Sequence, residues 1–289
     1  MSQQVYYHIV SLNLSSAESE IFICVRKFLR WLCANVTRQL GLKSKLNEYW
    51  DEEMGSLINT TIYFREYVLK EISEPVILAL DEFDKLFTFP NLGSDIHALL
   101  RRWNEEAKNI YIWQNLRLVI VNSTDSYISL STNCSPFNIG LTIDLPPFTR
   151  LQVNHLAELH GIYLTSYELK ELTEITGGFP YLVRLALYHS LHSQIPLEKI
   201  INNAKSDTGI FSNHLHQHLW YLKQDSDLAD AFQKAIAVNA PVYLEQEMAF
   251  KLKSLGLVNL EGNKATISCG LYREYFHNYF CEYTTNTKR

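Results

Sequence analysis

Two short, continuous apolar runs, at residues 75–80 and 116–121, limit the folds open to this 289-residue chain. Runs of this length without polar alternation are typical of parallel strands that are covered on both faces. Residues 20–40 and 95–108 carry apolar side chains at helical spacing, and residues 5–14 are rich in β-branched and aromatic side chains. Strands that alternate with helices predict a parallel sheet in an α/β domain.

A third, shorter apolar run at residues 141–145 predicts a further strand, and the pattern then changes at Pro146-Pro147. Only helical spacing follows, at residues 152–160, 166–176, 181–192 and 197–204. From residue 211 onward, further helices precede a hairpin signal around Gly262. We therefore expect three parts: an α/β domain at 1–147, a helical region at 148–208 and a winged-helix-like domain at 209–289.

Charge and composition exclude several classes of protein. The chain has 26 Lys+Arg against 31 Asp+Glu, a net charge of −5, so no global basic field favours nucleic acid or anionic lipid. No apolar run approaches the ~20 residues that cross a bilayer, and the N-terminus lacks the pattern of a secretory signal. The five cysteines include no Cys-x-x-Cys pair, which argues against a disulfide framework. A cytoplasmic protein without a membrane partner is the expectation.

The most specific local pattern is the acidic pair Asp81-Glu82 at the end of the run at 75–80. In nucleotide hydrolysis, a carboxylate at the end of a strand holds Mg²⁺, and a neighbouring carboxylate orients or deprotonates the attacking water. The pair therefore looks like a Walker B motif, with Asp81 as the metal ligand and Glu82 as the catalytic residue. A buried strand that simply ends in solvated acids would show the same residues.

Two further patterns predict residues that bind nucleotide. Asn122 and Ser123 follow the run at 116–121, and because ligands of α/β sheets lie at the carboxyl ends of the strands, they are expected near Asp81. Arg184 lies one turn inside a helix that begins after Gly177-Gly178. This segment resembles the sensor 2 region of AAA-type ATPases, where an arginine of the helical lid reaches phosphate oxygens. Each pattern has a structural alternative. Asn122 or Ser123 could simply cap a turn, and Gly177-Gly178 could simply form a tight turn between helices, with Arg184 as a surface cation.

Taken together, the order of these motifs resembles the AAA-like domain of bacterial, especially cyanobacterial, signalling proteins, which is related to origin-recognition and signal-transduction NTPases. The segments that carry the resemblance are residues 28–31 (FLRW), 49–52 (YWDE), 80–87 (LDEFDKLF), 99–103 (LLRRW), 113–118 (WQNLRL), 135–140 (SPFNIG) and 177–182 (GGFPYL). The resemblance implies a P-loop NTPase-type sheet, a helical lid and a C-terminal winged-helix domain. It also implies Mg²⁺ and ATP as cofactors, with Asn122 or Ser123 sensing the γ-phosphate and Arg184 contacting phosphate.

The chain departs from that family in one respect, because it contains no Gly-x-x-x-x-Gly-Lys-Ser/Thr loop. Without the backbone amides and the lysine that cradle a triphosphate, Mg²⁺ on Asp81 would have almost no phosphate to bridge. By resemblance, the strand that precedes this loop would lie between the strands at 116–121 and 141–145. The sheet is therefore expected to be incomplete, with an edge that those two strands close or that another chain fills.

Three hypotheses about function follow. The first is a regulatory module in signalling that is noncatalytic or that depends on a protein partner for nucleotide binding, with oligomerisation open. The second is an ATP-hydrolysing switch whose assigned start omits the phosphate loop, so that the chain is an ATPase only if the loop is supplied from elsewhere. The third is a DNA-binding regulator that acts through the winged helix. Residues 211–289 carry eight Lys+Arg and eight Asp+Glu, which favours protein over nucleic acid.

A cluster of histidines, His214, His216 and His218, is a candidate metal site. His214 and His218 would share one face of a helix. No acidic or cysteine ligand lies beside them at the spacing of zinc enzymes, so the pattern favours the solvated start of a helix.

Overall fold

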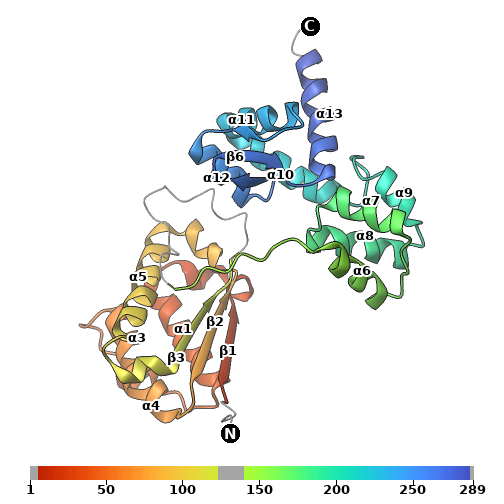
Figure 1. Cartoon of the computed structure of the whole chain (residues 1–289). Helices are drawn as coiled ribbons and strands as arrows, with labels where there is room; N and C mark the ends of the chain where they lie inside the picture. The colour runs from red at the N-terminus through yellow and green to blue at the C-terminus, as the bar shows by residue number, and fades with distance from the viewer. Residues whose placement is uncertain (1–5, 123–139, 287–289) are drawn as a thin grey trace. The chain divides into compact units, whose positions relative to one another are not determined.

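The computed structural model describes residues 6–122 and 140–286 of the chain. The chain divides into two compact units, Met1–Thr142 and Ile143–Arg289 (Figure 1). The second unit includes both segments expected as the helical region and the winged-helix-like domain, and the three-part division at 147 and 208 stays a prediction.

The first unit is built on three parallel strands, as the sequence predicts. They are β1 (His8–Asn13), β2 (Val76–Asp81) and β3 (Leu116–Ile120), in the order β1-β2-β3. The register pairs Asn13 with Asp81 and Leu80 with Ile120, so the carboxyl ends of all three strands lie at the same edge of the sheet.

One face of this sheet is covered by helices. The helices that supply the core are α1 (Val25–Gln39), α3 (Ser56–Tyr63) and α5 (Pro90–Glu106), and they lie beside the strands in Figure 1. Alternate strand residues such as Leu12 and Leu78 share one apolar cluster with Phe28 of α1 and Trp103 of α5. Because each buried side chain of this size contributes roughly 1.5–3 kcal/mol, this cluster fixes which face of each strand points inward.

The opposite face of the sheet is open, and this corrects the prediction of strands covered on both sides. Ile9, Val119 and Val121 lie at the alternate positions and are between 44% and 66% exposed, while Ile77 and Ala79 of the central strand are half-buried. A continuous apolar run therefore does mark each strand, but the described residues contribute no helix that buries its second face.

The strand predicted at residues 141–145 is wrong. This segment has no regular secondary structure, and Leu141, Ile143 and Leu145 are each at least 72% exposed. A strand needs a neighbour for its backbone hydrogen bonds, and the central strand expected beside β3 is not among the described residues. An apolar segment without such a neighbour cannot join the sheet.

Shorter elements complete the first unit. Residues 43–60 contain α2 (Leu46–Tyr49) and most of α3, which runs through a π-helical segment (Phe64–Val68) into α4 (Leu69–Glu71). Helix α5 begins five residues earlier than predicted, because Pro90 occupies its first turn, where a missing N–H costs nothing. The 3₁₀ segments are Leu14–Ser16, Ser19–Phe22, Phe83–Thr88 and Tyr111–Asn115.

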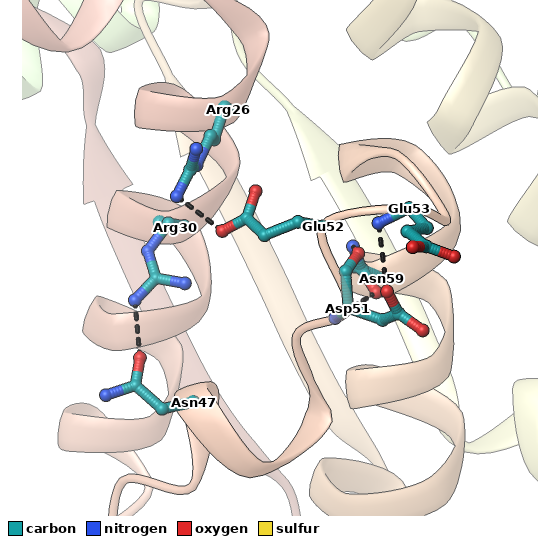
Figure 2. A network of polar contacts seen from close by, with 7 residues as sticks. All are labelled: Arg26, Arg30, Asn47, Asp51, Glu52, Glu53 and Asn59. Carbon is teal, nitrogen blue, oxygen red and sulfur yellow. Dashed lines mark hydrogen bonds and ion pairs between the residues drawn. The ribbon is translucent and has the colours of Figure 1, made fainter.

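A polar network fixes the loop between α2 and α3 (Figure 2). From α1, Arg26 pairs with Glu52, and Arg30 donates to Asn47 Oδ1 over 2.8 Å. The guanidinium of Arg30 also lies 5.0 Å from the ring centroid of Trp50. Asn59 of α3 binds the backbone of Asp51 in both directions, accepting from its N–H over 3.1 Å and donating to its carbonyl over 2.6 Å.

The second unit begins with four helices, all close to their predicted bounds. They are α6 (Arg150–Leu159), α7 (Ser166–Thr176), α8 (Pro180–His192) and α9 (Leu197–Asn202). Thr149 and Thr165 form complete capping boxes with Gln152 and Glu168, which satisfies the first N–H groups of α6 and α7.

The rest of this unit combines helices with a small antiparallel sheet. The helices are α10 (Ser212–Gln224), α11 (Ser226–Ala237), α12 (Gln246–Ser254) and α13 (Gly270–Asn286). Strands β4 (Val242–Tyr243), β5 (Val258–Glu261) and β6 (Lys264–Ile267) form the order β4-β6-β5, which confirms the predicted hairpin at Gly262. Within the described ranges, no helix is both long and apolar enough to cross a membrane.

Candidate functional site

Polar side chains gather at the carboxyl ends of the three parallel strands. Asn13 ends β1, Asp81 ends β2 with Glu82 directly after it, and Asn122 follows β3 by two residues. Val121 continues the ladder, since its N–H donates to the Leu80 carbonyl over 2.9 Å. The sheet therefore presents these groups along one edge, where ligands of parallel α/β sheets bind.

Asn13 ties the acidic pair to the first strand. Its Nδ2 donates to Asp81 Oδ2 over 3.1 Å and to Glu82 Oε1 over 3.3 Å. Ser15 Oγ donates to the other oxygen of Glu82, and the Glu82 N–H donates to Asp81 Oδ1 over 3.0 Å. Both carboxylates thus accept hydrogen bonds that hold them in place.

Glu82 has a strained backbone and a stabilised charge. Its φ of 52° and ψ of 42° place it in the left-handed region, which is unusual for a residue with a side chain. The hydrogen bonds from Ser15 and then Asn13 lower the pKa of its exposed carboxyl group. A lower pKa makes this carboxylate a weaker proton acceptor while these bonds persist, so in this conformation Glu82 is better placed to orient a water than to deprotonate it.

Lys85 is the cationic residue nearest to Asp81 and Glu82 in the sequence, and it is held by the segment that follows β1. Its Nζ donates to the carbonyls of Leu14 and Ala17 over 3.2 Å and 3.3 Å, and it lies 4.4 Å from the ring centroid of Phe22. These contacts anchor the segment after β1 to the segment after β2. Lys85 therefore has a structural role in the conformation described.

Asn122 has an unsatisfied buried oxygen. Its Oδ1 is enclosed and finds no hydrogen-bond donor among the described residues. A buried polar atom without a partner is costly, and a bound cation, a water or a ligand N–H would remove that cost. Ser123, the other residue predicted to sense the γ-phosphate, lies outside the described residues.

The donors present suit Mg²⁺, which prefers oxygen ligands and keeps several waters. Asp81 offers carboxylate oxygens and Asn122 offers the orphaned amide oxygen. No group of three His, Cys, Asp or Glu residues in the described part of the chain could hold a metal by itself. Such a site would therefore depend on phosphate oxygens for the remaining positions.

Arg184 belongs to the second unit, on α8, and its side chain is exposed. It makes no hydrogen bond or ion pair within the described ranges, so its guanidinium is available to a ligand. The two glycines that precede α8 are required by the backbone itself, independently of any ligand. Gly177 (φ 61°) ends α7, and a Cβ on Gly178 (φ 73°) would lie 2.2 Å from the Phe148 carbonyl oxygen.

The segment after β1 offers no cradle for phosphate. It reads Leu14-Ser15-Ser16-Ala17-Glu18, and the first glycine of the chain is Gly41, at the end of α1. Backbone N–H groups that surround a triphosphate require glycines at this kind of turn.

Sequence reasoning missed Asn13 and Ser15, which hold both carboxylates. The sequence does contain a signal for these two residues, because the first predicted strand ends in the polar segment Asn-Leu-Ser-Ser. Parallel pairing of β1 with β2 then places Asn13 opposite Asp81. The strand order, which the sequence does not display, is what brings the two together.

Comparisons with known proteins agree with this architecture. A profile of the AAA-like domain matches residues 1–278. Among solved structures, a Walker-type ATPase of Pyrococcus abyssi is similar in fold, with a TM-score of 0.62, 15% identity, and coverage of 93% of this chain and 84% of that one. The ORC1 protein of Aeropyrum pernix, solved in complex with DNA, aligns at a TM-score of 0.37, 13% identity, and 93% and 77% coverage. No curated protein sequence matches significantly.

Proposed function

Since this chain belongs to the AAA-like domain family, we propose that it is a regulatory module of signalling that does not hydrolyse ATP by itself. In this proposal, nucleotide binds only when a partner segment supplies the phosphate-binding loop. The observation that carries it is the combination at one edge of the sheet. Within the described residues, acidic and amide groups gather there without a glycine-rich turn, and the outer edge of β3 beside them has no neighbouring strand.

The open side of the sheet supports dependence on a partner. The outer edge of β3 has no neighbouring strand among the described residues. The uncovered face next to it exposes Ile9, Val119 and Val121. A strand, a loop and a helix from another segment would pair with this edge, reach the polar groups and cover the face. The partner is therefore a protein segment, either from another protein or from a second copy of the chain.

The residues would then take the roles expected of an AAA-like site. Asp81 would position Mg²⁺, and Asn122 or Ser123 would sense the γ-phosphate. Glu82 would orient the attacking water, which requires release from Ser15 if it is also to accept a proton. Arg184 would contact phosphate from α8. The bound Mg²⁺ and ATP would supply the charge and the reactive phosphoryl group.

The test is binding of Mg·ATP to the isolated chain, measured by calorimetry. We expect no binding at micromolar concentrations, because Asp81 and Asn122 alone hold few of the needed contacts. Binding in that range that Asp81→Ala abolishes would refute the noncatalytic proposal. A conservative control, Asp84→Asn, removes a nearby carboxylate without touching the predicted metal ligand.

The second candidate is an ATP-hydrolysing switch whose phosphate loop is encoded ahead of Met1 in the same polypeptide. The same unpaired β3 edge favours it, since a covalently attached strand would fill that position as well as a separate one. Inspection of the upstream reading frame for Gly-x-x-x-x-Gly-Lys-Ser/Thr distinguishes the two candidates. If the loop is found, hydrolysis by the extended chain that Glu82→Gln suppresses would establish the switch.

The DNA-binding alternative rests on the winged-helix interpretation of the second unit and is disfavoured by the surface of α12. This helix exposes Gln246, Glu247, Phe250 and Lys253. Its other lysine, Lys251, pairs with Asp225 and Glu247 and is therefore occupied. A DNA-recognition helix needs free basic and amide side chains that point into the major groove. We expect no shift of duplex DNA in a mobility assay at low salt, and a clear shift would restore this alternative.

A further inference from the structure

Two histidines and one tyrosine bring three potential metal-binding atoms together in the second unit. His214 and His218 lie one turn apart on α10, and Tyr272 lies on α13. His214 Nε2 is 2.6 Å from Tyr272 Oη and 3.1 Å from His218 Nε2. The third side of the triangle, from Tyr272 Oη to His218 Nε2, is 3.4 Å.

We propose that His214, His218 and Tyr272 form a binding site for a late first-row divalent transition ion, Zn²⁺ or Cu²⁺. Donors that bind one such ion at about 2.0–2.1 Å stand roughly 2.9–3.4 Å from one another. Two of the three separations fall in this range, and the shortest would widen by a few tenths of an ångström. The ion would replace the protons that now lie between these atoms.

The chemistry of the three donors suits such an ion. Imidazole nitrogens favour Zn²⁺ and Cu²⁺, and a phenolate adds the negative charge that two neutral imidazoles lack. Binding requires the histidines to be unprotonated. Burial lowers the pKa of both His214 and His218. The phenol proton of Tyr272 leaves to solvent when the ion binds.

The tyrosine is the donor that the histidine pattern in the sequence does not reveal. The described residues contain no group of three His, Cys, Asp or Glu side chains that could hold a metal. The third donor is instead a phenol more than fifty positions away, and it is 2% exposed. His216, the middle histidine of the cluster, faces away and pairs with Asp207 over 3.2 Å.

The surroundings of the site set an upper limit on affinity. His218 is 3% exposed, and its Nδ1 has no hydrogen-bond partner in the described part of the chain. Ligating histidines usually donate through this second nitrogen, and loss of that support weakens binding by about 10–100-fold. We therefore expect a dissociation constant in the micromolar range. The half-buried ring of His214 gives the ion a route from solvent.

The test uses the full chain without a histidine tag, in a background where Cys24, Cys134 and Cys281 are replaced by serine. The dialysed protein is titrated with Zn²⁺ by calorimetry and with Cu²⁺ by visible absorption. We expect one equivalent of either ion and a phenolate-to-copper charge-transfer band. His214→Gln should weaken binding at least tenfold, and Tyr272→Phe should remove the band.

A matched control comes from another pair of histidines on one helix face. His189→Gln with His192→Gln on α8 should leave stoichiometry and affinity unchanged. Far-ultraviolet circular dichroism of the apo variants checks that each remains folded. If His214→Gln fails to fold, the charge-transfer band of the unmodified chain still decides the matter. Absence of a band, or affinity unaffected by His214→Gln in a folded variant, would overturn the proposal.

Discussion

Gly178 is the position where one methyl group should be most damaging to the second unit. Its φ of 73° is left-handed, which costs an alanine roughly 1–2 kcal/mol. The added Cβ would also lie 2.2 Å from the Phe148 carbonyl oxygen and 3.2 Å from its nitrogen, both backbone atoms that cannot swing aside. Phe148 must then move, which endangers its 2.7 Å hydrogen bond to the Gly178 carbonyl. Together these effects predict a loss of about 3–5 kcal/mol for Gly178→Ala.

Gly161 supplies the matched control for this substitution. It has the same φ of 73° and lies in the same unit, but a Cβ there would meet nothing within 4 Å. Gly161→Ala should therefore lower the free energy of unfolding only through the left-handed backbone conformation. The loss should be about 1 kcal/mol, because the alanine also lowers the conformational entropy of the unfolded chain. Native-state hydrogen exchange of peptides from α7 and α8 measures both effects in the intact chain. Equal losses for the two variants would refute the steric argument.

Three further predictions concern a buried asparagine, the strained backbone of Glu82 and the reactivity of the cysteines. Asn59 is 1% exposed and holds both backbone groups of Asp51, so Asn59→Ala should lower the free energy of unfolding by about 1–3 kcal/mol in urea titration; Arg26→Ala, which removes an exposed ion pair, should cost less than ~1 kcal/mol. Glu82→Gly should be more stable than Glu82→Ala by about 0.5–1 kcal/mol, since only the glycine accepts φ 52° without strain. Burial raises the pKa of Cys33 and of Cys269 to about 12, so both stay protonated at pH 8 and should resist iodoacetamide in the folded chain, whereas the exposed Cys24 and Cys281 should react; mass spectrometry of the alkylated peptides checks this.

The sequence was informative wherever local chemistry decides the structure. Apolar runs located β2 and β3, and helical spacing at residues 166–176 predicted the bounds of α7. Polar residues at strand ends also indicated the edge of the sheet where Asp81, Glu82 and Asn122 lie.

Prediction failed where a residue depends on a neighbour that is distant in the chain. The run at 141–145 has the composition of a strand, but composition cannot supply the adjacent strand that its backbone needs. The same limit hid Asn13, whose role depends on the order β1-β2-β3, and Tyr272, which meets His214 only when α13 packs on α10.

The outer edge of β3, which has no neighbouring strand in the described part of the chain, has a kinetic consequence for the chain in a cell. Copies that meet through an unpaired strand edge associate at a rate that grows with the square of their concentration, whereas capture by a specific partner grows with the partner's abundance. If a protein partner covers this edge as proposed, the ratio of the two proteins, rather than the amount of either, would decide whether a newly made chain stays folded and available. Co-expression from one transcript would hold that ratio constant, and overproduction of this chain alone would direct it toward precipitation.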